Sequence, residues 1–140
     1  MKLAQKVALV LAAMTAILPG AAQARTRTIL FIGNSFTQGA YSPVVRYGAD
    51  RVTDLNKDGF GGVPALFATF ARQAKQDWKV SLETQGGRTL GFHWDERRKR
   101  FDKRWDAVVL QEYSTLDPKR PGDPTYYHHY APLLADLFHR

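Results

Sequence analysis

The sequence contains no cysteine among its 140 residues. It therefore has no disulfide bond, no thiolate nucleophile and no cysteine-ligated zinc site. Acidic residues are also few, with 13 Asp and Glu against 20 Lys and Arg, which gives a formal net charge of +7. This basic excess suits contact with acidic surfaces, but on its own it does not predict nucleic-acid binding.

Long apolar runs are absent except at the N-terminus. Lys2 and Lys6 flank the start of an apolar stretch at 7–18, a Pro-Gly pair ends it, and Ala22-Gln23-Ala24 offers small residues for cleavage. This order is typical of a secretory signal peptide, and the stretch is short for a membrane-spanning helix. We predict that residues 1–24 are a signal peptide of a periplasmic or secreted protein with no further membrane span. An uncleaved membrane anchor is the alternative.

The remaining 116 residues, 25–140, are predicted to form one domain. Without Lys2 and Lys6 there are 18 Lys and Arg against 13 Asp and Glu, a net charge of +5. An exported chain without disulfides depends on a hydrophobic core for its stability, so we expect a globular domain rather than a small disulfide-rich one. The length is enough for one domain but small for a doubly wound sheet.

Three segments have the composition of β-strands. The segment at 28–32 and the centre of the segment at 106–111 (residues 107–110) are apolar runs, which is typical of strands buried on both faces, and residues 78–84 form the third strand. Predicted helices follow each strand: a short one after Ser35 and then one at 63–75, one at 90–104, and one from Asp123 that Pro132 divides. Residues 41–62 are interpreted as an insertion. The pattern predicts a three-layer α/β/α, flavodoxin-like parallel sheet.

Unusual polar or glycine residues stand at the end of each predicted strand. Gly33-Asn34-Ser35 follows the first strand, Gly87 follows the second and Gln111 ends the third. The carboxyl ends of parallel strands share one edge, and open α/β sheets bind their ligands there. Glycine lets a backbone N–H approach a ligand closely. The structural alternatives are a helix N-cap at Asn34 and Ser35 and an ordinary turn at Gly87.

Together, these segments resemble the first three motifs of the SGNH (GDSL-type) hydrolase superfamily, over residues 28–114. Gly33-Asn34-Ser35-Phe36-Thr37 is similar to the nucleophile motif, in a variant with Asn before the serine. The resemblance implies that Ser35 is the nucleophile, that Gly33 and Asn34 support its turn, and that Gly87 N–H and the Gln111 amide form the oxyanion hole. The family usually has Asn where this sequence has Gln111, and Gln also carries an NH2 donor.

The resemblance implies an exported serine hydrolase that cleaves small-molecule, carbohydrate or lipid esters without a cofactor. The family's activating histidine lies in a C-terminal loop, with an aspartate three residues before it. Asp136 and His139 have this spacing and are candidates for the base, but they fall in the last predicted helix, so we interpret the match as a coincidence. We expect the sequence to be the N-terminal part of a longer hydrolase, truncated after the third strand and its helix and inactive alone.

Two other functions compete with hydrolysis. The first is a non-catalytic module of the same fold that binds an anion or a carbohydrate at the Ser35 turn. The second is calcium binding, because Asp54, Asn56 and Asp58 match the first half of a calcium loop. Leu66 stands where the closing glutamate of such a loop belongs, and an Asx turn is the simpler interpretation.

A basic run with interleaved aromatic residues spans positions 96–104. Such a run can bind nucleic acid. The acidic residues within it favour the solvated face of a surface helix instead, so no nucleic-acid partner is predicted. An acidic polymer or a membrane surface remains as a possible partner of this segment.

Overall fold

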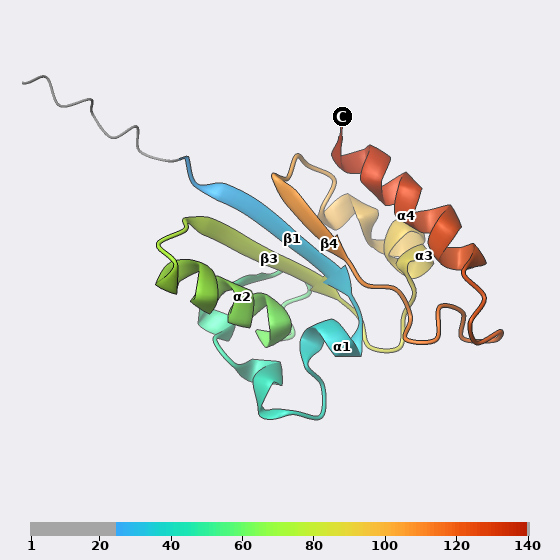
Figure 1. The fold of residues 1–140 in the computed structure, drawn as a ribbon, viewed down its shortest axis with the longest axis horizontal. Coiled ribbons are helices and arrows are strands. Elements are labelled where there is room, and N and C mark those ends of the chain that lie inside the picture. Colours follow the sequence, from blue (N-terminus) through green and yellow to red (C-terminus); the bar gives the residue numbers. More distant parts are fainter. Residues whose placement is uncertain (1–24, 140) are drawn as a thin grey trace, which may run out of the picture.

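The computed structural model describes residues 25–139, so the predicted signal peptide lies outside the described residues. The described residues contain a four-stranded, all-parallel sheet with the order β2-β3-β1-β4. Its strands are β1 (Arg27–Gly33), β2 (Thr53–Asp54), β3 (Trp78–Thr84) and β4 (Ala107–Leu110). The arrangement of the three longer strands, β3-β1-β4, confirms the flavodoxin-like prediction (Figure 1).

Helices cover both faces of this sheet. The α-helices are α1 (Ser35–Gln38), α2 (Gly62–Gln73), α3 (Leu90–Phe92) and α4 (Thr125–Phe138). Shorter turns are η1 (Pro43–Arg46), η2 (Ala49–Arg51), the π-helical η3 (His93–Arg97) and η4 (Arg98–Arg100). Helix α2 lies on one face, and α3 and α4 lie on the other, which gives three layers (Figure 1).

Strand β1 contributes to two separate hydrophobic cores because its side chains alternate between the faces of the sheet. Leu30 and Ile32 pack in the cluster that contains Leu134 of α4. Ile29 and Phe31 pack in the other cluster, against Phe67 of α2. All four β1 side chains are buried, as the uninterrupted apolar sequence predicted.

Strand β4 differs from its prediction. Its sequence predicted burial on both faces, but Val109 is 41% exposed. The reason is its place in the sheet: β4 is an edge strand and pairs only with β1 among the described residues. The opposite edge is the two-residue β2, which pairs with β3 and lies in the segment predicted as an insertion.

The single helix predicted over residues 90–104 is wrong. Helix α3 ends at Phe92 and the chain continues through η3 and η4 only as far as Arg100. The regular spacing is interrupted by the π-helical turn that starts at His93, whose side chain is fully buried against the Glu83 carboxylate of β3. The observed path still buries Phe101 and Trp105, the aromatic residues whose spacing suggested the helix.

Pro132 does not divide the last helix, contrary to prediction, because α4 continues through it. Proline removes one N–H donor from the helix. Pro132 is exposed, so water can bond to the carbonyl group that lacks its helical donor. None of the helices within residues 25–139 combines the length and the apolar character needed to span a bilayer.

Candidate functional site

Ser35 lies at the carboxyl end of the central strand β1, as the first residue of α1. Asn34 caps this helix, and its Oδ1 accepts a hydrogen bond from Phe36 N–H at 3.2 Å. The helix ends after one turn at Gly39, whose φ of 65° is in the left-handed region that favours glycine. Ser35 is therefore held at the edge of the sheet, half-buried, beside a Phe36 side chain that is 65% exposed.

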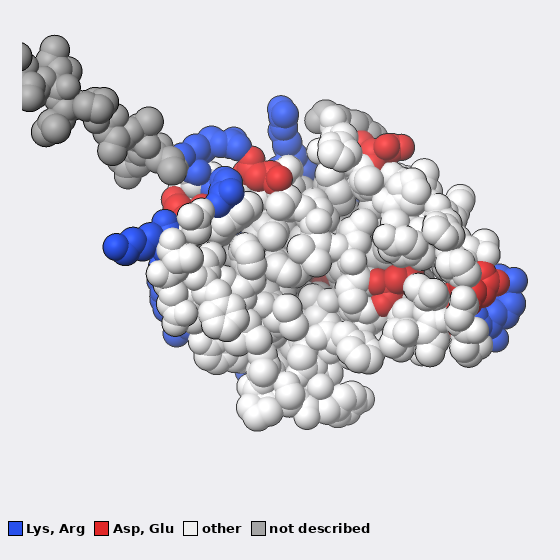
Figure 2. Space-filling model, in the orientation of Figure 1, with Lys and Arg blue, Asp and Glu red and all other residues white. Residues whose placement is uncertain are grey.

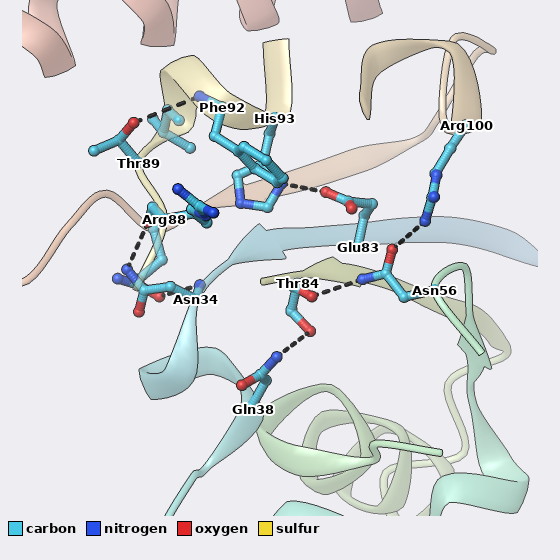
Figure 3. Close-up of polar contacts among 12 residues, drawn as sticks. Asn34, Gln38, Asn56, Glu83, Thr84, Arg88, Thr89, Phe92, His93 and Arg100 are labelled. Atoms are coloured by element: carbon cyan, nitrogen blue, oxygen red, sulfur yellow. Dashed lines mark hydrogen bonds and ion pairs between the residues drawn. The ribbon is translucent and has the colours of Figure 1, made fainter. Parts of the chain in front are cut away.

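Asn34 joins the loops that follow three strands. Its side chain is 2% exposed, and its Nδ2 donates to the carbonyl oxygens of Arg88 at 3.1 Å and Glu112 at 3.4 Å. Arg88 follows β3 and Glu112 follows β4, so one amide ties both loops to the Ser35 turn. Figure 3 shows the contact with Arg88. The Gln85 N–H also donates to Gly33 O at 3.0 Å. The structure thus brings together strand ends that are far apart in the sequence.

The Gln111 carboxamide lies against the turn that carries Ser35. Its Oε1 accepts from Asn34 N–H at 2.9 Å and from the Thr37 hydroxyl at 3.0 Å. Its Nε2 donates to Glu112 O and carries a second hydrogen. A Cβ at Gly33 would lie 2.8 Å from this Oε1 and would collide with the Thr37 hydroxyl. Glycine at position 33 is therefore what allows the Gln111 amide to approach.

Gly87 lies in the exposed turn between β3 and α3 with a φ of 68°. A Cβ at this position would meet no atom within 4 Å, so glycine is needed for the backbone conformation and not for space. Within the described part of the chain, the N–H groups of Ser35 and Gly87 donate to no backbone or side-chain acceptor. Both donors are available to a ligand.

A second polar network holds α1 to the end of β3, and sequence analysis missed Gln38 and Thr84 and gave Asn56 a different role. Gln38 Nε2 donates to Thr84 Oγ1 at 3.3 Å, and Asn56 Nδ2 donates to Thr84 O at 2.6 Å (Figure 3). Arg100 extends the network with a 2.6 Å bond to Asn56 Oδ1. Gln38 and Thr84 are buried. No motif marks them, because only the strand register brings them together.

The segment predicted as half of a calcium loop forms an Asx turn. The Asp54 carboxylate accepts the backbone N–H groups of Asn56, Asp58 and Phe60 at 2.9, 3.0 and 3.1 Å. The Asn56 side chain points instead to Thr84 and Arg100. Over residues 25–139 no three His, Asp or Glu side chains are grouped as a metal site would require.

No hydrogen bond within residues 25–139 joins a histidine to Ser35. His93 is fully buried and its Nδ1 contacts the Glu83 carboxylate (Figure 3). Asp136 and His139 lie at the end of α4, and His139 lines a cavity with Asp106 and Ala107, where β4 begins. This is the opposite end of the sheet from Ser35 (Figure 1). The structure therefore does not bring these two candidates for a base to the serine.

Two clefts flank the Phe36 side chain. The smaller has a volume of about 260 Å³ and is lined by Ser35, Phe36, Gly39, Ala40 and Tyr41. The larger has a volume of about 510 Å³ and extends from Phe36 to Tyr127, over Gln111, Glu112, Tyr113, Ser114 and Leu116. Figure 2 shows that the surface around α1 is almost free of charged side chains in this view. The clefts thus offer an aromatic and mostly uncharged surface beside Ser35.

Comparisons with known proteins add no relative: no family model matches the sequence, and neither a curated protein nor a solved structure matches it. A fold of this type hosts many activities, so the fold alone assigns none. What is established is an α/β domain with a four-stranded parallel sheet, in which the loops after β1, β3 and β4 meet at Asn34, next to Ser35.

Proposed function

We propose that this protein is an exported serine hydrolase of the SGNH (GDSL-type) kind that cleaves acyl esters, with Ser35 as its nucleophile. The observation that carries the proposal is the junction at Asn34, which ties three strand-end loops together by bonds of 2.9 to 3.4 Å. A catalytic turn needs such support, because small displacements of the reacting groups slow a reaction strongly.

In the proposed reaction, Ser35 Oγ attacks the ester carbonyl carbon and its proton passes to a base. The negative charge that develops on the carbonyl oxygen is stabilised by the N–H groups of Ser35 and Gly87 and by the second N–H of Gln111. Collapse of this intermediate expels the alcohol, which takes the proton, and water then releases the acid from the serine. The two clefts beside Phe36 give room for the two sides of the ester.

A serine hydroxyl reacts slowly without a base, usually a histidine. The described residues provide no histidine hydrogen-bonded to Ser35. The proposed mechanism therefore needs a base that is not among the hydrogen-bond partners of Ser35 within these residues. We predict that residues 25–139 alone hydrolyse esters poorly.

The test is labelling of the exported fraction of the source cells with a fluorophosphonate, followed by mass spectrometry of the adduct. We expect the adduct on Ser35, its loss in Ser35→Ala and its retention in Ser42→Ala, a control serine that lines neither cleft. Ser35→Ala should change the free energy of unfolding by less than about 0.5 kcal/mol. A folded protein that shows no adduct would contradict the proposal.

The second candidate function is non-catalytic binding of an anion or a carbohydrate at the same turn, which is favoured because no histidine among residues 25–139 is hydrogen-bonded to Ser35. Backbone N–H groups would then hold the ligand. Binding would survive Ser35→Ala, measured by calorimetry with phosphate or sulfate. Retained binding together with an unlabelled Ser35 would select this function over hydrolysis.

A further inference from the structure

Residues 97–104, here called the basic run, carry the densest positive charge on the molecule. Six of these eight residues are Lys or Arg: Arg97, Arg98, Lys99, Arg100, Lys103 and Arg104. All except Arg97 are exposed. The run leaves the helical path at η4 and continues towards the start of β4.

The charge of the basic run is not neutralised within the protein. The ion pairs found over residues 25–139 are those of Arg25 with Asp106, Arg120 with two aspartates, and His93 with Glu83. None involves the run, although Asp102 lies within it. Like charges held together repel one another, so an uncompensated cluster of this size favours a negatively charged partner.

Several of these basic side chains are already held in place. The Arg98 guanidinium lies over the Trp94 ring at 5.0 Å, and the Lys103 ammonium lies over the Trp105 ring at 4.3 Å. Arg100 is fixed by its bond to Asn56. Ordering long side chains costs free energy on binding, and prior fixation reduces that cost.

A neighbouring loop extends the positive surface. The contact between Arg100 and Asn56 places the run beside Lys57, which is exposed. Arg46 Nη1 reaches the same loop and donates to the carbonyl oxygens of Asp58 and Gly59, both at 3.3 Å. The loop also carries the exposed carboxylate of Asp58, so positive charge exceeds negative charge here without being exclusive.

The aromatic residues of this region narrow the choice of partner. Phe101 and Trp105 are buried and Trp94 lies under Arg98, so the bases of a single-stranded nucleic acid lack a free ring on which to stack. The run also lacks an exposed apolar side chain for insertion into a bilayer, and stable membrane anchoring needs such a second signal besides basic charge. A soluble polymer of carboxylate or sulfate groups fits both observations, since guanidinium groups pair with these anions.

We infer that the basic run binds an acidic polysaccharide. The test measures the affinity of the protein for heparin and for polygalacturonate over a series of salt concentrations, with neutral dextran as the blank. Arg98→Gln/Lys99→Gln should weaken binding at least about 10-fold and lower the slope of log affinity against log salt by about two. Lys75→Gln/Lys79→Gln is the matched control, since it removes the same charge from exposed positions outside the run.

The control pair should change affinity less than about 2-fold, because only net charge is altered. Lys103→Gln/Arg104→Gln repeats the test within the run if the first pair fails to fold, as judged by circular dichroism. Equal losses in the run and control variants would overturn the inference. Tighter binding to duplex DNA or to vesicles with anionic phospholipid than to either glycan would also overturn it. Ser35→Ala should bind like the wild type, so the outcome is independent of the proposed hydrolysis.

Discussion

The two ends of the β-sheet use polar side chains in opposite ways. At the amino end, Arg25 pairs with Asp106, and Thr26 bonds to Asp77, all at the surface. At the carboxyl end, the residues that join the loops are buried: the neutral Asn34, Thr37, Gln38 and Thr84, together with the carboxylate of Glu112. Exposed ion pairs contribute little to stability, whereas a buried polar group that loses its partner costs much more.

This contrast shows where the chain depends on exact side-chain geometry. Surface contacts at the amino end can be replaced by water. The amide and hydroxyl groups at the carboxyl end have no such substitute, because each satisfies a buried donor or acceptor of a neighbouring loop. Buried polar networks at a ligand-binding edge also hold loops rigid, which is what a site needs.

The largest effect is expected from Asn34→Ala. The change leaves Phe36 N–H, Arg88 O and Glu112 O without their side-chain partner. We expect the free energy of unfolding to fall by about 3 kcal/mol, measured in urea. Asn34→Asp keeps the acceptor for Phe36 N–H but turns a buried carboxylate oxygen towards Arg88 O and Glu112 O, so it should lose at least as much. A comparable loss in the free energy of unfolding for Arg25→Ala would show that the two ends of the sheet do not differ in this way.

A smaller effect is expected from Gly33→Ala. The new methyl group would press on the Thr37 hydroxyl and on Gln111 Oε1, so the two strand ends must separate. Overpacking of this kind should cost about 2 kcal/mol. Gly86→Ala is the control, because its Cβ would meet only Gln38 Oε1 at 3.8 Å. If both variants unfold at the same urea concentration, the close approach at Gly33 is unimportant.

The smallest effect is expected at the amino end, from Asp106→Asn. The Thr28 backbone N–H at 2.7 Å lowers the pKa of Asp106, with further help from the Thr28 hydroxyl and Arg25. Because the folded pKa lies below the unfolded value of about 3.9, this stabilisation is complete above that pH and is lost as the pH falls through the folded pKa.

The melting temperature of Asp106→Asn should therefore be lower than that of the wild type at neutral pH. The two values should converge as the pH falls through the folded pKa of Asp106. Asp117 and Asp123 also have lowered pKa values, but both residues are present in the variant and in the wild type. Their contributions therefore cancel when the two melting temperatures are compared. If the difference between the two melting temperatures grows as the pH falls, the pKa of Asp106 is not lowered by folding.

The sequence predicted those strands of the sheet that have a clear apolar or alternating pattern. Residues 78–84 form β3 as predicted, and the predicted strand at 28–32 extends by one residue at each end. The meeting of Gly33, Asn34 and Gln111 also followed from parallel strands, because their carboxyl ends must share an edge.

Other features left no local signal. Strand β2 has only two residues, too few to show a period. The bonds of Gln38 and Thr84 depend on the register between β1 and β3, which no single segment encodes. The irregular path after Phe92 begins at His93, whose buried contact with Glu83 of β3 is not encoded in the helical spacing of residues 90–104.

The central place of β1 has a consequence for how the chain reaches its native state. Its neighbours β3 and β4 both come later in the sequence, and the bonded pair Thr28–Asp106 is 78 positions apart. Contacts between such distant residues must wait for closure of a long loop, which slows folding. During synthesis one side of β1 stays bare until β4 has emerged, so the nascent chain exposes an unpaired strand edge for most of its growth.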